Sequence, residues 1–121
     1  MKKLILISSL LIAFNLHSQW EPAGDKIKTR WSDNIDPESV LQEYPRPLLV
    51  RKDWKNLNGL WDYSITGKGQ RKPESYDGKI LVPFAIESSL SGVQKRISES
   101  NELWYYHNFS IPRKWKKKQI I

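Results

Sequence analysis

Hydrophobic and polar residues alternate most regularly near the end of the chain, between Leu103 and Pro112. An alternation of this kind has the two-residue period of a strand, and Pro112 stops it. One face would carry Leu103, Tyr105, His107, Phe109 and Ile111. The pattern predicts a strand over residues 103–112, with His107 among the side chains of its apolar face.

Two earlier segments are also typical of strands. Over Leu60–Thr66, large apolar residues alternate with small polar ones, which indicates a half-buried strand launched by the turn at Asn58-Gly59. The short apolar run Lys79–Pro83 favours a strand that is covered on both faces. A further strand is expected to begin at Lys118–Ile121.

The remaining segments have no strand period. Residues 19–43 are polar and irregular, which predicts an extended arm with one helical turn at Asp36–Gln42, capped by Asp36. The prolines of Tyr44–Pro47 favour extension. Residues 88–101 form a long serine-rich loop, a length that is usually functional or disordered.

Three strands and no amphipathic helix make the expected class all-β. An antiparallel sandwich needs about seven or eight strands to cover both inner faces. We therefore expect residues 44–121 to be an incomplete antiparallel β-sandwich, the N-terminal portion of a larger protein.

The start of the chain has the layout of a secretory signal peptide. A positive Met1–Lys3 precedes the apolar run Leu4–Leu16, and a small residue follows at Ser18. The run of about 13 residues is shorter than the roughly 20 that span a bilayer, so no stable membrane span is expected. We predict that residues 1–18 are removed and that the protein is exported, either periplasmic or secreted. The lack of cysteine excludes a disulfide scaffold.

The net charge is +7, and much of the excess lies in the basic run Arg113–Lys118, which contains Trp115. A basic run with an aromatic residue can bind nucleic acid, whereas in an all-β protein it can also be a solvated turn between strands. An exported chain seldom meets nucleic acid. We therefore favour the turn and expect no nucleic-acid partner.

Four short motifs occur in an order that matches one enzyme family. They are Tyr44-Pro45-Arg46-Pro47, Leu57-Asn58-Gly59-Leu60-Trp61-Asp62-Tyr63, Ile80-Leu81-Val82-Pro83-Phe84 and Leu103-Trp104-Tyr105 with Phe109 and Ile111-Pro112. In this order, behind a signal peptide, residues 44–121 resemble the N-terminal sugar-binding domain of glycoside hydrolase family 2. That family includes β-galactosidases, β-glucuronidases and β-mannosidases. The resemblance implies a jelly-roll, galactose-binding-like β-sandwich, followed in the family by an immunoglobulin-like domain and a (β/α)8 barrel.

The activity that the resemblance implies is retaining hydrolysis of O-glycosyl bonds in carbohydrates, such as β-galactosides. Two carboxyl groups about 5 Å apart perform this reaction, and in the family both belong to glutamates of the barrel. We therefore assign no catalytic residue in this chain, and no catalytic role to Glu87, Glu99 or Glu102. The β-glycoside substrate would bind through the barrel. Neither a cofactor nor a metal is expected, and this part alone should be inactive.

One residue is a candidate for substrate contact. Family members extend the loop after Val82-Pro83 towards the barrel, and some carry a polar residue where this chain has Ala85. Glu87 is the nearest residue that can hydrogen-bond a sugar hydroxyl, although it can equally be an ordinary loop carboxylate. The large rings of the strands either fill a core, which we favour, or stack on sugars; they are Trp61, Tyr63, Trp104 and Tyr105.

The segment Trp104-Tyr105-Tyr106-His107 departs from the common family form, which has arginine after Trp-Tyr. His107 shares the apolar face of its strand, so a packed core histidine is favoured over a catalytic or metal-binding one. Asn108-Phe109-Ser110 matches a glycosylation sequon, which we attribute to chance inside a strand. The competing hypotheses are a free-standing carbohydrate-binding module and a truncated gene product that does not fold. The nucleotide sequence after Ile121 would discriminate between these hypotheses.

Overall fold

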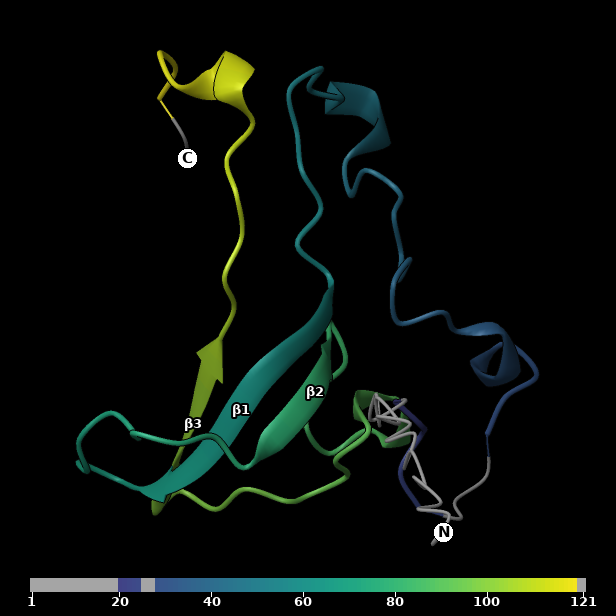
Figure 1. Ribbon diagram of the computed structural model, residues 1–121. Coiled ribbons are helices and arrows are strands. Elements are labelled where there is room, and N and C mark those ends of the chain that lie inside the picture. The colour runs from purple at the N-terminus through teal and green to yellow at the C-terminus, as the bar shows by residue number, and fades with distance from the viewer. Residues whose placement is uncertain (1–19, 25–27, 120–121) are drawn as a thin grey trace, which may run out of the picture.

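The computed structural model describes residues 20–24 and 28–119, and these form one antiparallel sheet with long extensions (Figure 1). The strands are β1 (Gly59–Gly67), β2 (Gly78–Val82) and β3 (Asn101–Tyr106), in the order β2-β1-β3. Helical structure in the described residues is limited to short 3-10 turns: η1 (Ser32–Asn34), η2 (Pro47–Leu49), η3 (Ser89–Ser91) and η4 (Arg113–Trp115). The expected all-β character is confirmed, as are the positions of the first two strands. The predicted signal peptide, residues 1–18, lies outside the described residues.

The register of the sheet decides which side chains share a face. Trp61 pairs with Ile80, and Tyr63 pairs with Tyr105, so that partners in each pair point to the same side. On this face Tyr63 and Ile80 are buried. Leu81 and Ser64, which point to the opposite face, are buried as well. The central part of the sheet is therefore covered on both sides.

The loop after β2 supplies the cover for the first face. Ile86 is buried against Tyr63 and Ile80, and Val93 and Ile97 pack against the same cluster. Residues 88–101 are largely the expected loop, and their packing argues against the disordered alternative, while a functional role stays a prediction. The segment is an irregular loop, so its apolar residues follow neither a helical nor a strand period. Periodicity therefore could not indicate that these residues are packed.

The second face carries polar contacts. Trp104 donates its indole N–H to Thr66 Oγ1 over 2.9 Å. Tyr76, from the segment between β1 and β2, stacks on Tyr106 with 5.4 Å between the ring centroids. Trp104 thus lies on the opposite side of the sheet from Trp61 and Tyr63. Tyr105 remains 43% exposed, so its predicted place in the core is wrong.

The third strand is shorter than its alternation predicts. It ends at Tyr106 instead of continuing to Pro112, and residues 107–112 leave the sheet as an extended segment (Figure 1). An extended segment turns its side chains alternately to two sides whether or not its backbone is paired. The alternation therefore identified the faces correctly without showing where pairing ends. Lys118 and Gln119 likewise belong to no strand.

The N-terminal arm is held by turns and side-chain caps. The Asp36 carboxylate accepts a hydrogen bond from the Glu38 amide at 2.9 Å, and its carbonyl accepts one from Ser39 at 3.0 Å, which gives one turn but no helix. Asn58 donates to the carbonyl of Val40, whose side chain is buried. Pro47, which was predicted to be extended, begins η2, whereas residues 44–46 belong to no helix or strand. No helix in the described residues is long and apolar enough to cross a membrane.

Candidate binding groove

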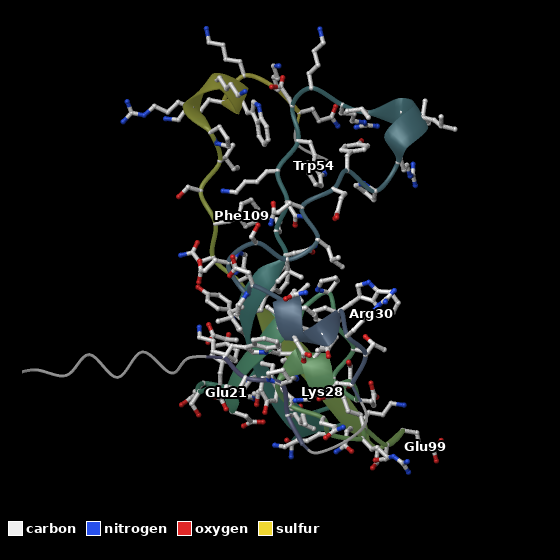
Figure 2. All side chains as sticks on the ribbon, turned by 90° about the vertical axis from the view of Figure 1, so that its right-hand side faces the viewer. Glu21, Lys28, Arg30, Trp54, Glu99 and Phe109 are labelled. Carbon is white, nitrogen blue, oxygen red and sulfur yellow. The ribbon has the colours of Figure 1, made fainter. Side chains whose placement is uncertain are left out.

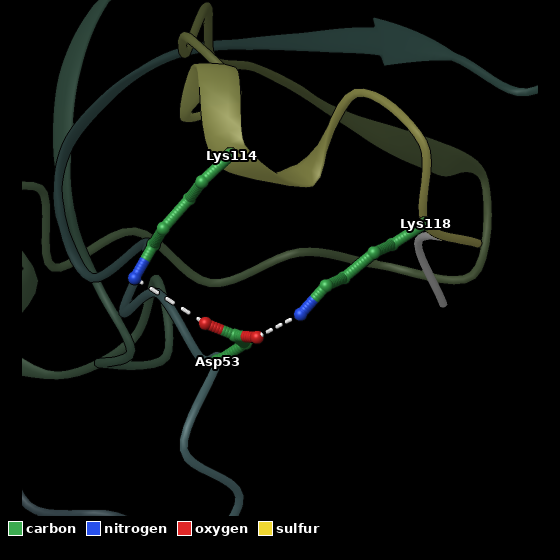
Figure 3. Close-up of polar contacts among 3 residues, drawn as sticks. All are labelled: Asp53, Lys114 and Lys118. Carbon is green, nitrogen blue, oxygen red and sulfur yellow. Dashed lines mark hydrogen bonds and ion pairs between the residues drawn. The ribbon is translucent and has the colours of Figure 1, made fainter.

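Two extended segments run side by side beyond the end of the sheet, residues 51–57 and residues 107–112 (Figure 1). Lys55 connects them, because its ammonium donates a hydrogen bond to the Ser110 carbonyl at 3.1 Å. Farther out, Asp53 forms ion pairs with Lys114, at 3.3 Å, and with Lys118 (Figure 3). These polar contacts hold η4 against the segment that precedes β1.

A groove of about 430 Å³ lies between these segments. Half of the side chains that line it are apolar or aromatic, and they are Trp54, Leu57, Phe109, Ile111, Pro112 and Trp115. Arg51, Lys55 and Lys118 add positive charge at its edges. A concave site with aromatic walls and a few polar groups has the character of a ligand site.

A row of stacked rings leads from the sheet to this groove. His107 stacks on Trp61 with 4.9 Å between the centroids and 10° between the planes. Phe109 continues the row, 6.3 Å from His107 and 14° from parallel, and Lys55 Nζ lies 6.0 Å from the Phe109 centroid. His107 is therefore a packing residue, as the sequence favoured, although it lies beyond the end of β3. The described residues contain no group of three side chains able to hold a metal ion.

The charge of Asp53 is fixed by its neighbours. The Lys118 ammonium holds the pKa of Asp53 well below its usual range, and Lys114 acts in the same direction. The indole of Trp115 also favours the ionised carboxylate. Asp53 is thus an anion at neutral pH, and it cannot donate a proton to a leaving group there.

Glu87, the candidate for substrate contact, lies outside this groove. It is exposed on the turn that the Ser88 amide closes by donating to the Ala85 carbonyl at 2.8 Å. Partial burial raises the pKa of the Tyr105 phenol, and the negative charge of Glu87 raises it further. Tyr105 meets Trp61 edge-on, with the ring centroids 6.3 Å apart, so the row of rings continues from the groove to Tyr105.

The sequence did not point to Asp53 or Trp54 as members of a site. Both lie in a polar segment without period, and the partners of Asp53 are up to 65 positions away in the chain. In the sequence, the basic run Arg113–Lys118 is the one feature that points to a site here, and its pattern favours a turn between strands. It contains η4, and two of its lysines bind Asp53.

A second hollow, of about 420 Å³, lies between the arm and the end of β2, next to Trp31, Val40 and Phe84. It is lined by fewer aromatic residues and has no ion pair at its rim among the described residues. The groove beside Trp54 is thus the stronger candidate. No protein-family model matches this chain, and it has no match among curated proteins.

Proposed function

We propose that this chain is the non-catalytic sugar-binding part of an exported retaining β-glycosidase of glycoside hydrolase family 2. Its sheet would belong to a jelly-roll β-sandwich, and the acid and nucleophile would be supplied by a separate barrel domain. The proposal rests on the resemblance of the quoted motifs to that family. Its consequence for the chain itself is carbohydrate binding without hydrolysis.

The observation that carries the proposal is the register of the motifs. Gly59 of the first strand motif pairs with Val82 of the Val-Pro motif, and Tyr63 pairs with Tyr105 of the Leu-Trp-Tyr motif. Motifs that are separated in the sequence are thus neighbours in one sheet. This contiguity is expected if they evolved together as parts of one domain.

The groove supports carbohydrate as the ligand class. Trp54, Phe109 and Trp115 line it, and aromatic faces pack on the apolar faces of sugar rings. Lys55 and Arg51 offer donors for hydroxyl or ring oxygens. Glu87, which is exposed outside the groove, offers an acceptor that would bind a second part of an extended glycan.

The test combines binding and catalysis in the full chain. Affinity electrophoresis in gels containing β-linked galactan or mannan should retard the protein. Trp54→Ala should restore most of its mobility, because loss of a stacking ring weakens binding. Trp31→Ala removes an exposed tryptophan next to the second hollow and should leave the retardation unchanged.

Hydrolysis should be absent. Incubation with nitrophenyl β-galactoside, β-glucuronide and β-mannoside should release no nitrophenol above the buffer rate, because the described residues hold no pair of carboxylates in the groove. Enzyme-dependent release of nitrophenol would disprove the assignment as a non-catalytic part. Equal retardation of the wild type and Trp54→Ala would disprove the groove as the sugar site.

A further inference from the structure

The positive charge of the chain is concentrated at one end of the molecule. Residues 44–58 and 107–119, here called the basic lobe, contain nine lysines and arginines and a single acid, Asp53. Their net charge of +8 exceeds the +7 of the whole chain, so the remaining residues together carry −1. The basic side chains of the lobe project from the end farthest from the sheet, where η2 and η4 lie (Figure 2).

The same end exposes three consecutive apolar residues. Leu48 is 96% exposed, Leu49 70% and Val50 63%, and together they form the outer part of η2 and its C-terminal cap. Arg46, Arg51 and Lys52 flank them in the sequence. Apolar side chains this exposed are unfavourable in water, so a partner that covers them gains hydrophobic free energy.

Charge discriminates between the partners that could cover the exposed residues Leu48–Val50, here called the apolar tip. A second copy of the chain would bring one lobe of +8 against another, and like charges repel. A soluble polyanion neutralises the lysines but offers no apolar surface to Leu48. An anionic bilayer offers both, because its phosphates attract the basic side chains and its acyl chains accept the apolar residues.

We propose that the basic lobe docks on an anionic lipid bilayer, with Leu48–Val50 inserted at the boundary of headgroups and acyl chains. Lys116 and Lys117, which follow η4, bind the lipid phosphates. They are free to do so, because in the described residues the Asp53 ion pairs use Lys114 and Lys118 instead. The sheet then faces away from the membrane, since it lies at the other end of the molecule (Figure 2).

The test uses a local probe, because the apolar residues 4–16 can enter a bilayer by themselves. The chain contains no cysteine, so Val50→Cys can be labelled uniquely with an environment-sensitive fluorophore in the full chain. Vesicles of phosphatidylcholine with phosphatidylglycerol should shift its emission to the blue and increase it. Lys68→Cys, labelled at the opposite end of the sheet, should show no shift, and pure phosphatidylcholine should give a much weaker signal at position 50.

Variants carrying the Val50→Cys probe separate the contribution of charge to lipid binding from that of apolar burial. Lys116→Gln with Lys117→Gln should raise the half-maximal lipid concentration about 25-fold, because each basic residue near an anionic surface contributes about fivefold. Leu48→Ser should raise it about tenfold or more through lost apolar burial. The matched control, Lys68→Gln with Arg71→Gln, removes the same charge from the opposite end of the sheet. It should leave the half-maximal lipid concentration unchanged.

Four results would overturn the proposal. The first is an unchanged emission at position 50 with anionic vesicles, and the second is an equal shift at position 68. The third is a lipid titration that Leu48→Ser leaves unchanged. The fourth is a concentration-dependent dimer that Leu48→Ser dissociates, which would assign Leu48–Val50 to a contact with a second copy. Docking would be supported if added salt reverses the emission shift at position 50 and if both variants of the basic lobe, Lys116→Gln with Lys117→Gln and Leu48→Ser, bind the vesicles more weakly.

Discussion

His107 lies flat against Trp61, with ring planes 10° apart and centroids 4.9 Å apart. The contact occurs one residue beyond the end of β3, where backbone pairing with β1 has stopped. It is therefore a side-chain contact that directs residues 107–112 along the segment before β1 instead of away from the protein. The position of one wall of the groove depends on this stack, because Phe109 follows in the same row.

Replacing His107 should loosen that wall. His107→Ala removes the stack on Trp61 and should lower the free energy of unfolding by about 0.5–1.5 kcal/mol, the range for aromatic pairs. His107→Phe keeps a flat ring and should lose much less. Urea unfolding followed by tryptophan fluorescence measures both, and equal stabilities of the two variants would contradict the stacking role.

The ion pairs of Asp53 should make the lobe sensitive to acid. Its carboxyl pKa is lowered in the folded protein from the ordinary value of 3.8, with Lys118 as the main cause. A lowered pKa contributes stability above 3.8 that is lost as the pH falls towards the folded-state pKa, because the unfolded chain takes up the proton first. The wild type should therefore lose stability between about pH 5 and pH 2 through this group, whereas Asp53→Asn should lack that component.

Urea unfolding across that pH range at low and high salt provides the measurement. Glu99→Gln is the matched control, because Glu99 is exposed and forms no ion pair in the described part of the chain. It should keep the pH dependence of the wild type. Since Asp53 is open to solvent, salt should reduce its contribution, and a pH profile identical in Asp53→Asn and wild type would exclude the ion pairs as a source of stability.

The sheet and the groove differ in how far the sequence predicts them. The positions of β1 and β2 follow from alternating or continuous apolar residues, because burial of side chains is what fixes a strand in a sheet. Asp53 and Lys118 are joined across 65 positions by charge alone, and charge leaves no periodic trace. The sequence therefore predicted the positions of two strands, but not the groove, which depends on where residues 107–112 run after β3 ends at Tyr106.

The core can be tested at its most buried position. Ile80 is completely buried between Tyr63 and Ile86, so Ile80→Ala should lower the free energy of unfolding by about 2–5 kcal/mol. Leu48→Ala shortens an aliphatic side chain at a surface position and should change the free energy of unfolding by less than about 0.5 kcal/mol. Chemical unfolding of both variants measures the two changes. Similar losses in the two would mean that the cover of the sheet by Ile86 does not form.

Ser91 should be the position in the loop covering the sheet at which substitution lowers stability most. Its buried hydroxyl donates to the Ser88 carbonyl at 2.7 Å and accepts hydrogen bonds from the amides of Val93, at 3.0 Å, and Gln94, at 3.3 Å. Ser91→Ala leaves these groups without the hydroxyl, which should cost about 1–3 kcal/mol for polar groups left unsatisfied in a buried site.

Hydrogen exchange locates that loss. In Ser91→Ala the amides of Val93 and Gln94 should exchange faster than in the wild type, while amides at the centre of β1, such as that of Tyr63, should follow only the global change in stability. Ser98→Ala is the comparison, because Ser98 is an exposed serine of the same loop. Uniform acceleration across the sheet and loop in Ser91→Ala would show that the hydroxyl stabilises the whole fold and not the loop. Selective acceleration at residues 93 and 94 would show that a single buried serine shapes the segment that covers Tyr63.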